Sequence, residues 1–446
     1  MEKFIINGPT VLHGNVTIAG AKNVALKAIV TSLLTDDEIV LHNMPQIRDV
    51  HLMLDVVESL GAHVRIDGNT IYIKDGNTKG TIVPLEIGAR LRTSSMVLGP
   101  MLSRYGNATI PNPGGCRIGA RPIDRHIEGL KLMGATIEYD SKDGYFHAHA
   151  QHLHGAQISF LKNTHTGTET LMLAAVLADG TTILKNAAEE VEIDDLIALL
   201  NAMGANIRRS GNREITIVGV PKLHGTEYAI MSDRNEEVTF AIAALVTKGD
   251  ITVHHSQRRH MKSFLEAFEK AGGVYKMIDD TTTQYFYDKP IQPVDIVTGS
   301  HPGFMTDWQA PWAILMTQAK GVSTIHETVF ENRFTYVEEL RKMGADIAYF
   351  NPVVNNPKSF YNFNWEDKAT ETHQAIRITG PTPLHNAITS MSDLRAGATV
   401  VLAAIIAQGQ SYIYGVEQID RGYEHIDERL QSLGASIERI EEDAVV

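Results

Sequence analysis

Leu60-Gly61-Ala62-His63-Val64 is the stretch that decides the fold, because it is the first of six similar stretches in this chain. In each copy an apolar helical stripe ends at a glycine and a strand begins directly after it, as expected for a helix C-cap that leads into a strand. The central glycines are separated by 73, 70, 68, 72 and 90 residues. This near-constant spacing predicts six copies of one structural unit. The other five copies are Met133-Gly134-Ala135-Thr136-Ile137, Met203-Gly204-Ala205-Asn206-Ile207, Ala271-Gly272-Gly273-Val274, Met343-Gly344-Ala345-Asp346-Ile347 and Leu433-Gly434-Ala435-Ser436-Ile437.

A second pattern, an apolar helix followed by a glycine and a short β-branched strand, lies upstream of each stripe. Clear cases run from Ala175 to Leu184, from Ala241 to Val253 and from Ala403 to Tyr414. Each unit of about 70 residues therefore holds two helices and several strands, which is too small for a robust core of its own. We expect the six units to merge, three and three, into two α/β domains of similar size.

The last of the five spacings between the repeated glycines, 90 residues, is longer than the others. Its excess falls in residues 351 to 374, a polar stretch that is rich in asparagine and aromatic residues. A long segment of this composition predicts an insertion between two strands, on the surface of the second domain. The sequence assigns no function to it.

The overall composition excludes several classes of protein. With 446 residues, 43% of them hydrophobic and 21% charged, the chain is an ordinary globular protein that is long enough for more than one core. A net charge of -13 argues against a nucleic-acid binder. A single cysteine excludes an intrachain disulfide, and no apolar run approaches the roughly 20 residues that cross a bilayer. We therefore expect a cytoplasmic protein without a membrane segment.

The single cysteine, Cys116, lies in the glycine-rich stretch from Pro113 to Arg121. Arg117 and Arg121 are cations that can lower the pKa of a nearby thiol, and the glycines allow the chain to turn and to expose its amides. A free cysteine is also often a small buried hydrophobic residue. The local sequence leaves a chemical role and a packing role open.

Arginines recur in the loops that join the short strand of a unit to its second helix. Equivalent loops of repeated units tend to meet at one face, and a guanidinium group matches phosphate or carboxylate with two parallel hydrogen bonds. The pattern predicts an anion-binding pocket in an otherwise acidic protein. The alternative for any one arginine is a solvated ion pair. The loop arginines and those that begin helices are Arg48, Arg92, Arg117, Arg121, Arg258, Arg259, Arg333, Arg395 and Arg421.

Motifs for nucleotide cofactors and for metals are missing from the sequence. There is no Gly-x-Gly-x-x-Gly fingerprint and no Walker loop, and the 19 histidines show no metal-binding spacing. We therefore expect no metal and no cofactor.

Seven stretches of the chain carry a further signal: Gly20-Ala21-Lys22-Asn23, Arg92-Thr93-Ser94, Pro113 through Asp124, Thr306-Asp307-Trp308-Gln309, Glu331-Asn332-Arg333-Phe334, Asp393-Leu394-Arg395-Ala396 and Asp420-Arg421-Gly422-Tyr423-Glu424. In this order they resemble the UDP-N-acetylglucosamine enolpyruvyl transferases, and the resemblance spans nearly the whole chain. It implies two inside-out α/β domains, each built from three βαβαββ units with the helices inside. It places the first domain at residues 22–230, carrying the cysteine loop, and the second at 1–21 plus 231–446, with the active site in the cleft between them.

The resemblance also implies a reaction. Enolpyruvate passes from phosphoenolpyruvate to the 3-hydroxyl of UDP-N-acetylglucosamine and phosphate is released, which is the first committed step of peptidoglycan synthesis. Asp307 would take the proton of the sugar hydroxyl, and Cys116 would protonate the methylene carbon and be the target of fosfomycin. No cofactor, nucleic acid or obligate protein partner is implied. The residues implied for the phosphate and the carboxylate are Lys22, Arg92, Arg121, Arg395 and Arg421, and Arg333 is implied as a further substrate-binding residue.

Further matches concern the sugar nucleotide. Lys162 and Thr164 fall where the family grips the diphosphate, Val329 where a backbone group contacts the nucleotide, and Asn23 where the sugar is held. The residues implied to read the uracil are Arg121, Pro122, Ile123, Asp124 and Arg125.

The chain departs from the family pattern at Thr164-His165-Thr166, where Ser-Val-Gly is common, and at Arg48, where lysine is common. The alternatives are a related enzyme with another acceptor and a nucleotide sensor without catalytic activity.

Overall fold

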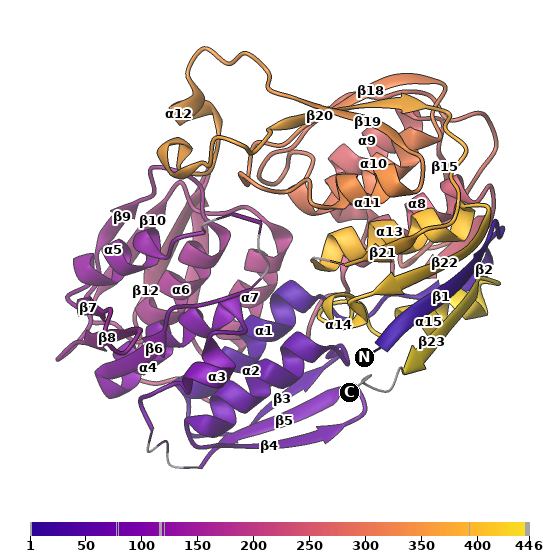
Figure 1. Ribbon diagram of the computed structural model, residues 1–446. Helices are drawn as coiled ribbons and strands as arrows, with labels where there is room; N and C mark the ends of the chain where they lie inside the picture. Colours follow the sequence, from indigo (N-terminus) through magenta and orange to yellow (C-terminus); the bar gives the residue numbers. More distant parts are fainter. Residues whose placement is uncertain are drawn as a thin grey trace. The chain divides into compact units, whose positions relative to one another are not determined.

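The computed structural model describes residues 2–441 except Asn77, Lys79, Cys116, Arg117, Ala120 and Ser392. Contacts divide the chain into two compact units, coloured by sequence in Figure 1. Unit 1 comprises Met1–Ala19, Cys116–Ala120 and Ser232–Val446, and unit 2 comprises Gly20–Gly115 and Arg121–Met231. Of segment 116–120 the structure describes Ile118 and Gly119, which group with unit 1 although the flanking residues belong to unit 2.

Unit 2 contains three small sheets in its described part, with strand orders β13-β3-β5-β4, β6-β8-β7 and β11-β12-β10-β9. In the first and third sheets one edge pair is parallel and the other pairs are antiparallel. The strands are β3 (Ile39–His42), β4 (Ala62–Asp67), β5 (Thr70–Asp75), β6 (Asn107–Pro111), β7 (Thr136–Asp140), β8 (Tyr145–His149), β9 (Gln157–Ser159), β10 (Thr181–Lys185), β11 (Asn206–Gly211), β12 (Glu214–Val218) and β13 (Glu227–Ala229). The helices are α1 (Lys22–Thr31), η1 (Ser32–Leu34), α2 (Arg48–Ser59), α3 (Leu85–Gly88), η2 (Arg92–Val97), α4 (Leu98–Tyr105), α5 (Asp124–Leu132), α6 (His165–Ala175) and α7 (Val191–Ala202).

Unit 1 repeats this plan in the residues described, with sheets β15-β16-β14-β2, β17-β18-β20-β19 and β21-β22-β1-β23. The first strands of the chain complete two of these sheets, because β2 pairs with β14 and β1 lies between β22 and β23. The strands are β1 (Glu2–Gly8), β2 (His13–Thr17), β14 (Asp250–His254), β15 (Val274–Met277), β16 (Thr282–Phe286), β17 (Ile296–Val297), β18 (Gly321–His326), β19 (Asp346–Phe350), β20 (Ala375–Gly380), β21 (Ile388–Ser390), β22 (Gly409–Tyr414) and β23 (Ser436–Glu441). The helices are α8 (Arg234–Val246), η3 (Arg258–His260), α9 (Lys262–Lys270), η4 (Thr306–Trp308), α10 (Gln309–Thr317), α11 (Tyr336–Lys342), α12 (Pro357–Phe360), η5 (Trp365–Asp367), α13 (Leu394–Ile406), α14 (Val416–Ile419) and α15 (Ile426–Ser432).

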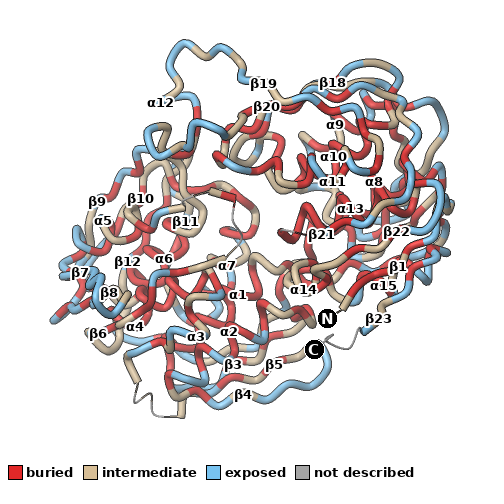
Figure 2. Tube along the Cα trace, viewed as in Figure 1, coloured by how far each residue is buried: buried red, intermediate tan, exposed pale blue. Residues whose placement is uncertain are grey.

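The first helix of most repeats lies inside its unit and the strands lie outside. Every residue of α8 and α10 is buried, and α13 is buried except at its last residue. In Figure 2 these helices are red, whereas the outer strands carry pale blue positions. Beyond their first turns these helices are almost entirely apolar and have no face to offer to water, so the sheets must surround them. Each unit has its own hydrophobic core, and in unit 2 the inner helices are α1 and α6.

The six repeated glycines explain the period of the sequence. Each has a positive φ, between 93° and 116°, directly after its helix. Glycine adopts this left-handed conformation without the steric cost that a Cβ would bring, so it ends the helix and turns the chain into the strand. The predicted helix-to-strand junctions are therefore confirmed, as are the helix and strand of the second pattern at α6 and β10, α8 and β14, and α13 and β22.

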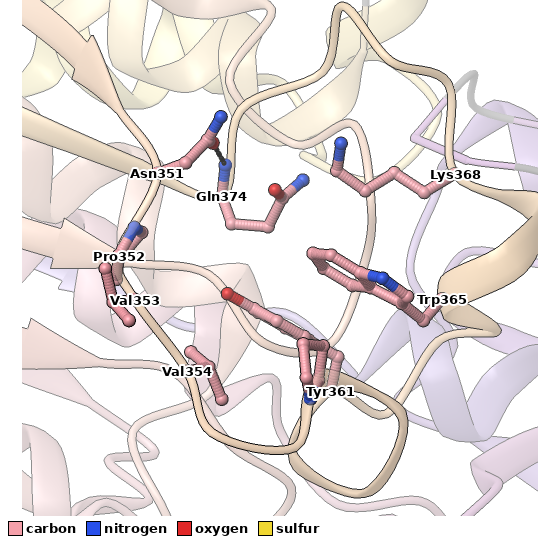
Figure 3. Close-up of a pocket in the computed structure, with 9 residues that line it drawn as sticks. Asn351, Pro352, Val353, Val354, Tyr361, Trp365, Lys368 and Gln374 are labelled. Carbon is pink, nitrogen blue, oxygen red and sulfur yellow. Dashed lines mark hydrogen bonds between the residues drawn. The ribbon is translucent and has the colours of Figure 1, made fainter.

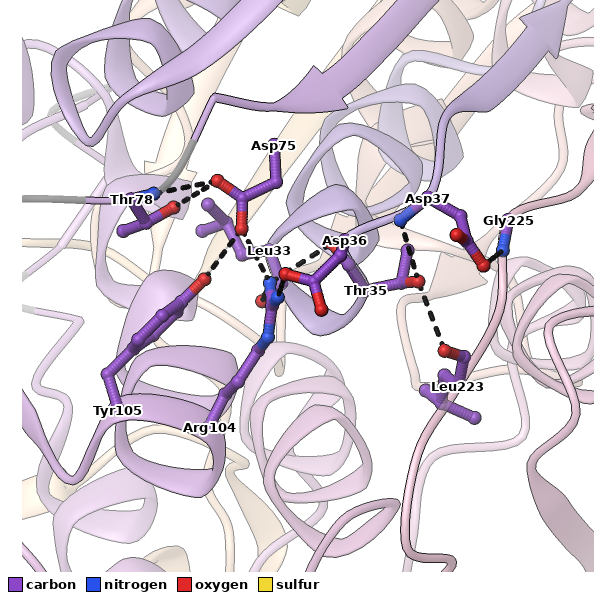
Figure 4. Close-up of polar contacts among 10 residues, drawn as sticks. All are labelled: Leu33, Thr35, Asp36, Asp37, Asp75, Thr78, Arg104, Tyr105, Leu223 and Gly225. Carbon is purple, nitrogen blue, oxygen red and sulfur yellow. Dashed lines mark hydrogen bonds and ion pairs between the residues drawn. The ribbon is translucent and has the colours of Figure 1, made fainter.

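A polar network in unit 2 fixes the end of the inner helix α1 and its extension η1 (Figure 4). Arg104 of α4 donates to the carbonyls of Leu33 and Thr35 at 3.2 and 3.0 Å, and pairs with Asp75 at 3.0 Å. The Tyr105 hydroxyl donates to the same carboxylate at 3.0 Å. Carbonyls at a helix C-terminus have no partner within the helix, so this arginine satisfies them.

The insertion predicted at residues 351–374 joins β19 to β20, which are antiparallel neighbours in one sheet. It carries α12 and η5. The predicted insertion between strands is therefore confirmed. No helix in the described part of the chain is both long and apolar enough to span a bilayer.

Candidate active site

Unit 1 contributes an ion pair between the predicted base and a predicted substrate-binding arginine. Asp307 lies in η4, and its Oδ1 is 2.5 Å from Nη2 of Arg333. The Arg333 side chain is 6% exposed and the Asp307 side chain is 23% exposed, so a substrate can reach the carboxylate while the guanidinium is buried. Gln309 donates to the Arg333 carbonyl at 3.2 Å. A guanidinium partner favours the charged carboxylate, which is the form that accepts a proton.

The short helix that carries Asp307 is anchored on both sides. The Thr306 hydroxyl donates to Glu327 at 2.8 Å, and the Trp308 indole donates to Asn235 of α8 at 2.8 Å. Asn235 belongs to the polar first turn of α8, which is buried in unit 1. These bonds from Thr306 and Trp308 hold η4 in place, and with it the backbone that carries the Asp307 side chain.

Arg395 is the second predicted anion-binding group of unit 1. It begins α13, where the Asp393 side chain caps the helix by accepting from the Arg395 and Ala396 amides at 2.9 and 3.1 Å. Arg395 is 4% exposed, yet its Nε and Nη1 donate to no group of the described chain. Its guanidinium lies 5.1 Å from the centre of the Tyr423 ring.

The charge on Arg395 is balanced within unit 1. Burial disfavours this charge, but Tyr423 and the carboxylates of Asp307 and Asp233 keep the pKa of Arg395 above its ordinary value. Buried guanidinium donors normally have partners, so free donors on a charged side chain indicate a place for an anion. The remaining predicted cation of this unit, Arg421, lies in the loop between α14 and α15.

Glu327 is a functional candidate that the sequence reasoning missed. It is 1% exposed and accepts from the Thr306 hydroxyl and from the amides of Val329 and Phe330 at 2.8, 2.7 and 3.1 Å. Burial raises its pKa, while Arg333 and these hydrogen bonds act in the opposite direction. The Val329 amide is therefore engaged within the chain, which leaves its carbonyl for the predicted contact to a nucleotide. In the sequence, Glu327 was marked only by its place at the end of a strand, two residues before Val329.

In unit 2 the predicted Lys22 begins α1 and pairs with a buried carboxylate. Its Nζ is 2.8 Å from Oδ2 of Asp49 in α2, and their side chains are 12% and 2% exposed. Sequence reasoning noted Asp49 only as a neighbour of Arg48 and gave it no role. The pair holds the ammonium in place at a helix start, where anions are also favoured by backbone amides. The carbonyl of Asn23 accepts a hydrogen bond from the Lys27 ammonium.

Two further predicted arginines of unit 2 repel each other. Burial, followed by the charge of Arg121, lowers the pKa of Arg92 to about 10, while Asp124 acts in the opposite direction. Arg121 has a φ of 47°, a conformation that is uncommon for residues with a Cβ. Two like charges held close together favour an anionic ligand. Asp124 begins α5, and its buried Oδ1 has no hydrogen-bond partner in the part of the chain that the structure describes. Cys116 lies outside the described residues, so its placement stays a prediction.

Most of the residues predicted for the sugar nucleotide lie in unit 2, whereas Val329 lies in unit 1. Arg125 donates to the carbonyl of Asn163 at 3.3 Å, next in sequence to Lys162. Burial and then Arg125 lower the pKa of Lys162. Thr164 caps α6 by accepting from the Gly167 amide at 3.2 Å. A basic loop at a helix N-terminus suits a diphosphate. Pro122 precedes α5, and Ile123 is 5% exposed and packs in the hydrophobic core of unit 2, so its role in reading the uracil stays a prediction.

His165, at a departure from the family pattern, joins a charge cluster in which Lys27 and Glu169 are buried and its own side chain is 25% exposed. Its Nε2 is 3.1 Å from Oε1 of Glu169, and Nζ of Lys27 is 3.2 Å from the same oxygen. Burial acts against a charge on His165, but Glu169 and Glu190 raise its pKa above the ordinary value. The residue common in the family, valine, could not make this pair.

The structure therefore brings the predicted residues together in two sets, one on each unit. Unit 1 presents Asp307 beside the cations of Arg333 and Arg395, and unit 2 presents cations on three loops. In unit 1 the Asp307 carboxylate can accept a proton next to a bound anion, and in unit 2 the cations can hold phosphate groups. Among the residues described, no three His, Cys, Asp or Glu side chains gather as metal ligands.

Comparison with known proteins identifies the class. Residues 6–430 match the profile of the EPSP synthase family, the 3-phosphoshikimate 1-carboxyvinyltransferases. The chain is 43% identical over 444 residues to UDP-N-acetylglucosamine 1-carboxyvinyltransferase of Acidobacterium capsulatum, covering 99% of this chain and 96% of that protein. It is 42% identical over 441 residues to the protein of the same name from Magnetococcus marinus, covering 99% and 100%. The chain therefore belongs to the EPSP synthase family, and it is a transferase. Within this family it falls among the relatives named UDP-N-acetylglucosamine 1-carboxyvinyltransferase, as the sequence resemblance predicted.

Solved structures show the same fold. The enolpyruvyl transferase NikO from Streptomyces tendae superimposes with a TM-score of 0.85 at 22% identity, over 98% of both chains. EPSP synthase from Acinetobacter baumannii superimposes with a TM-score of 0.71 at 18% identity, over 99% of this chain and 100% of that chain. At these identities the likeness concerns the fold alone. It confirms the predicted fold class of two α/β domains with the helices inside.

Proposed function

We propose that this protein transfers the enolpyruvyl group of phosphoenolpyruvate to the 3-hydroxyl of UDP-N-acetylglucosamine and releases phosphate. The observation that carries the proposal is the placement of Asp307 beside two buried guanidinium groups, one of which has free donors. A carboxylate next to an anion site is what a proton-accepting base needs when its substrate reacts with an acid such as phosphoenolpyruvate. The names of the relatives at 40–43% identity support the acceptor.

The proposed chemistry has two steps. In the addition, the sugar oxygen forms a bond to C2 of phosphoenolpyruvate, Asp307 takes the hydroxyl proton, and an acid delivers a proton to C3. In the elimination, the conjugate base of this acid takes a proton back from C3, the C2–C3 double bond forms again, and the bond from C2 to phosphate breaks so that phosphate leaves with the bonding electrons. Cys116 is the proposed acid, since a thiol on a glycine-rich loop between arginines can deliver a proton to carbon.

The cations divide the negative charge of the two substrates. We assign the phosphate and carboxylate of phosphoenolpyruvate to Arg395 and Arg421 on unit 1 and to Lys22, Arg92 and Arg121 on unit 2. Fixed donors aimed at developing charge are commonly worth about 3 kcal/mol each in catalysis. The assignment requires both units to reach one substrate, so the active site lies in the proposed cleft between the predicted domains 22–230 and 1–21 plus 231–446.

We assign the sugar nucleotide to a second group of residues. The diphosphate contacts Lys162 and the α6 terminus at Thr164, and the sugar contacts Asn23 and Arg333. The Val329 backbone holds the nucleotide, and the uracil lies against the loop that includes Pro122, Asp124 and Arg125. We further propose that the protein acts in the cytoplasm in peptidoglycan synthesis, and through it in cell shape and division.

Release of phosphate tests the acceptor. With purified protein and phosphoenolpyruvate, we expect phosphate release only when UDP-N-acetylglucosamine is present. Release with UMP or shikimate 3-phosphate in its place would indicate a related enzyme with another acceptor. Tight binding of UDP-N-acetylglucosamine without turnover would indicate a sensor. The identity to the named relatives disfavours both alternatives.

The proposed acid has its own test. Fosfomycin, an epoxide that resembles phosphoenolpyruvate, is expected to open on the Cys116 sulfur and to add its mass to the peptide that contains this residue. Because this is the single cysteine of the chain, peptide mass spectrometry gives an unambiguous answer. Modification at another residue, or no modification of a protein that turns over, contradicts the assignment.

A further inference from the structure

The insertion between β19 and β20 encloses a pocket that the proposed reaction does not use. Its volume is about 320 Å³, at the small end of the range for ligand sites. All of its lining residues come from the insertion and its two ends, and none belongs to the residues assigned to the substrates (Figure 3). They are Asn351, Pro352, Val353, Val354, Pro357, Tyr361, Trp365, Lys368 and Gln374.

Gln374 offers the pocket a fixed and unsatisfied donor. The residue is 1% exposed, and its side-chain Nε2 has no hydrogen-bond partner among the described residues. Both backbone groups are engaged, because its amide donates to Asn351 Oδ1 at 3.1 Å and its carbonyl accepts from the Glu327 amide at 2.8 Å. The side-chain amide points into the pocket in Figure 3. A buried amide without a partner costs stability, so this donor indicates an acceptor on a ligand.

One side of the pocket is aromatic. The rings of Tyr361 and Trp365 are stacked with centroids 4.8 Å apart and an angle of 14° between their planes. The Tyr361 hydroxyl is 3.0 Å from Nε2 of His326 in β18, which ties this side to the sheet. The facing side is formed by the aliphatic segment 352–354. Val353 is 99% exposed, so this apolar surface is not used by the protein itself. A slot between an aromatic and an aliphatic side suits a flat ring.

Lys368 adds a positive charge at the rim. Its ammonium lies 5.5 Å from the centre of the Trp365 ring and donates to the Ala369 carbonyl at 3.1 Å. It takes part in no ion pair among the described residues, whereas the nearby Lys358 pairs with Glu366. In Figure 3 the Lys368 ammonium and the Gln374 amide extend on the same side of the Trp365 ring. Both groups donate hydrogen bonds, so the end of the ligand that meets them must accept them and is best served by a negative charge.

We propose that this pocket binds a small aromatic carboxylate, with the ring between the stacked Tyr361–Trp365 pair and the segment 352–354 and the carboxylate on Gln374 and Lys368. The site is separate from the residues assigned to phosphoenolpyruvate and to the sugar nucleotide. The proposal does not depend on the proposed reaction, because it concerns a different set of residues.

Binding of indole-3-carboxylate to the full-length protein tests the site, measured by ligand-observed NMR and by isothermal titration calorimetry. We expect saturable binding of one molecule, and at least tenfold weaker binding of indole, which lacks the carboxylate, and of cyclohexanecarboxylate, which lacks the flat ring. Saturating phosphoenolpyruvate and UDP-N-acetylglucosamine leave the binding unchanged. Displacement by either substrate would overturn the proposal, and so would equal binding of the three probes or no binding of indole-3-carboxylate.

Variants of the two donors complete the test. Gln374→Leu and Lys368→Met are each expected to weaken indole-3-carboxylate about tenfold, which is typical for the loss of a hydrogen bond to a charged group. Lys358→Met is the matched control, because it removes a lysine of the same insertion that does not line the pocket. Gln374→Glu provides a second variant that keeps the size of the side chain and repels a carboxylate. Unchanged thermal unfolding shows that the variants are folded, and unchanged affinity in folded Gln374→Leu and Lys368→Met would refute the site.

Discussion

Replacing Arg395 by methionine is the perturbation that the structure makes most informative. The side chain is 4% exposed, carries a full charge, and leaves Nε and Nη1 without hydrogen-bond partners among the described residues. If both donors bind the anionic part of phosphoenolpyruvate, the variant loses two charge-assisted hydrogen bonds of about 1.5–3 kcal/mol each. At about 1.4 kcal/mol per factor of ten, the sum of about 3–6 kcal/mol corresponds to a fall of about 10²- to 10⁴-fold in kcat/KM for phosphoenolpyruvate.

The effect on folding is expected to be much smaller than the effect on activity. In the folded state Nε and Nη1 make no hydrogen bond to the described residues that the substitution could remove, and the neighbouring Asp307 keeps Arg333 as its partner. We therefore expect the free energy of unfolding to change by no more than about 2 kcal/mol.

The assay is steady-state phosphate release at saturating UDP-N-acetylglucosamine, together with urea unfolding of the same preparations. Arg377→Met is the matched control, because Arg377 is an exposed arginine of β20 in the same unit. We expect this control to retain the parent kcat/KM. A folded Arg395→Met protein whose kcat/KM lies within about fivefold of the parent would refute the assignment of the free donors to the substrate.

Three other predictions concern Asp307, the Asp49 partner of Lys22, and His165. Asp307→Asn is expected to lower kcat about 10²- to 10⁴-fold, as for the loss of a general base, while calorimetry shows nearly unchanged binding of UDP-N-acetylglucosamine; activity close to that of the parent would remove the base. Asp49→Asn leaves the Lys22 ammonium without its carboxylate and is expected to lower kcat/KM for phosphoenolpyruvate about tenfold with less effect on KM for the sugar nucleotide; equal effects on both would indicate a structural role alone. The pKa of His165 is raised in the folded state, so its protonated form stabilises the protein below about pH 6.5, and this contribution is lost as the pH rises through the folded pKa. Urea unfolding at about pH 6 and pH 8 is therefore expected to show a larger loss of stability for the parent than for His165→Val, and an identical pH dependence of the two would contradict the pairing with Glu169.

The repeated glycines show why the fold could be predicted from the sequence. Gly61, Gly134 and their four counterparts each occupy a backbone conformation that other residues adopt only at a cost, so the requirement is visible at a single position. The buried helices could be recognised for a similar reason, since α13 is apolar on all sides and has no exposed face.

The site could be predicted only in part, because much of it depends on contacts between distant segments. Asp307 and Arg333 were both predicted, but 26 positions separate them, and their pairing follows from the packing of η4 against the loop after β18. Glu327 was missed because a buried carboxyl at a strand end has no local motif. From the sequence, the insertion could be interpreted only as a surface segment, because the position of Gln374 facing Trp365 depends on how the insertion folds back on itself.

The product formed from phosphoenolpyruvate and UDP-N-acetylglucosamine tests the central claim most directly. Incubation of the purified protein with both substrates, followed by mass spectrometry of the nucleotide fraction, is expected to show UDP-N-acetylglucosamine in which a carboxyvinyl group has replaced one hydrogen, formed in equal amount to the phosphate released. The same reaction with Asp307→Asn is expected to yield far less of this product. Unmodified UDP-N-acetylglucosamine after phosphoenolpyruvate has been consumed, or a carboxyvinyl group on a different acceptor, would contradict the account.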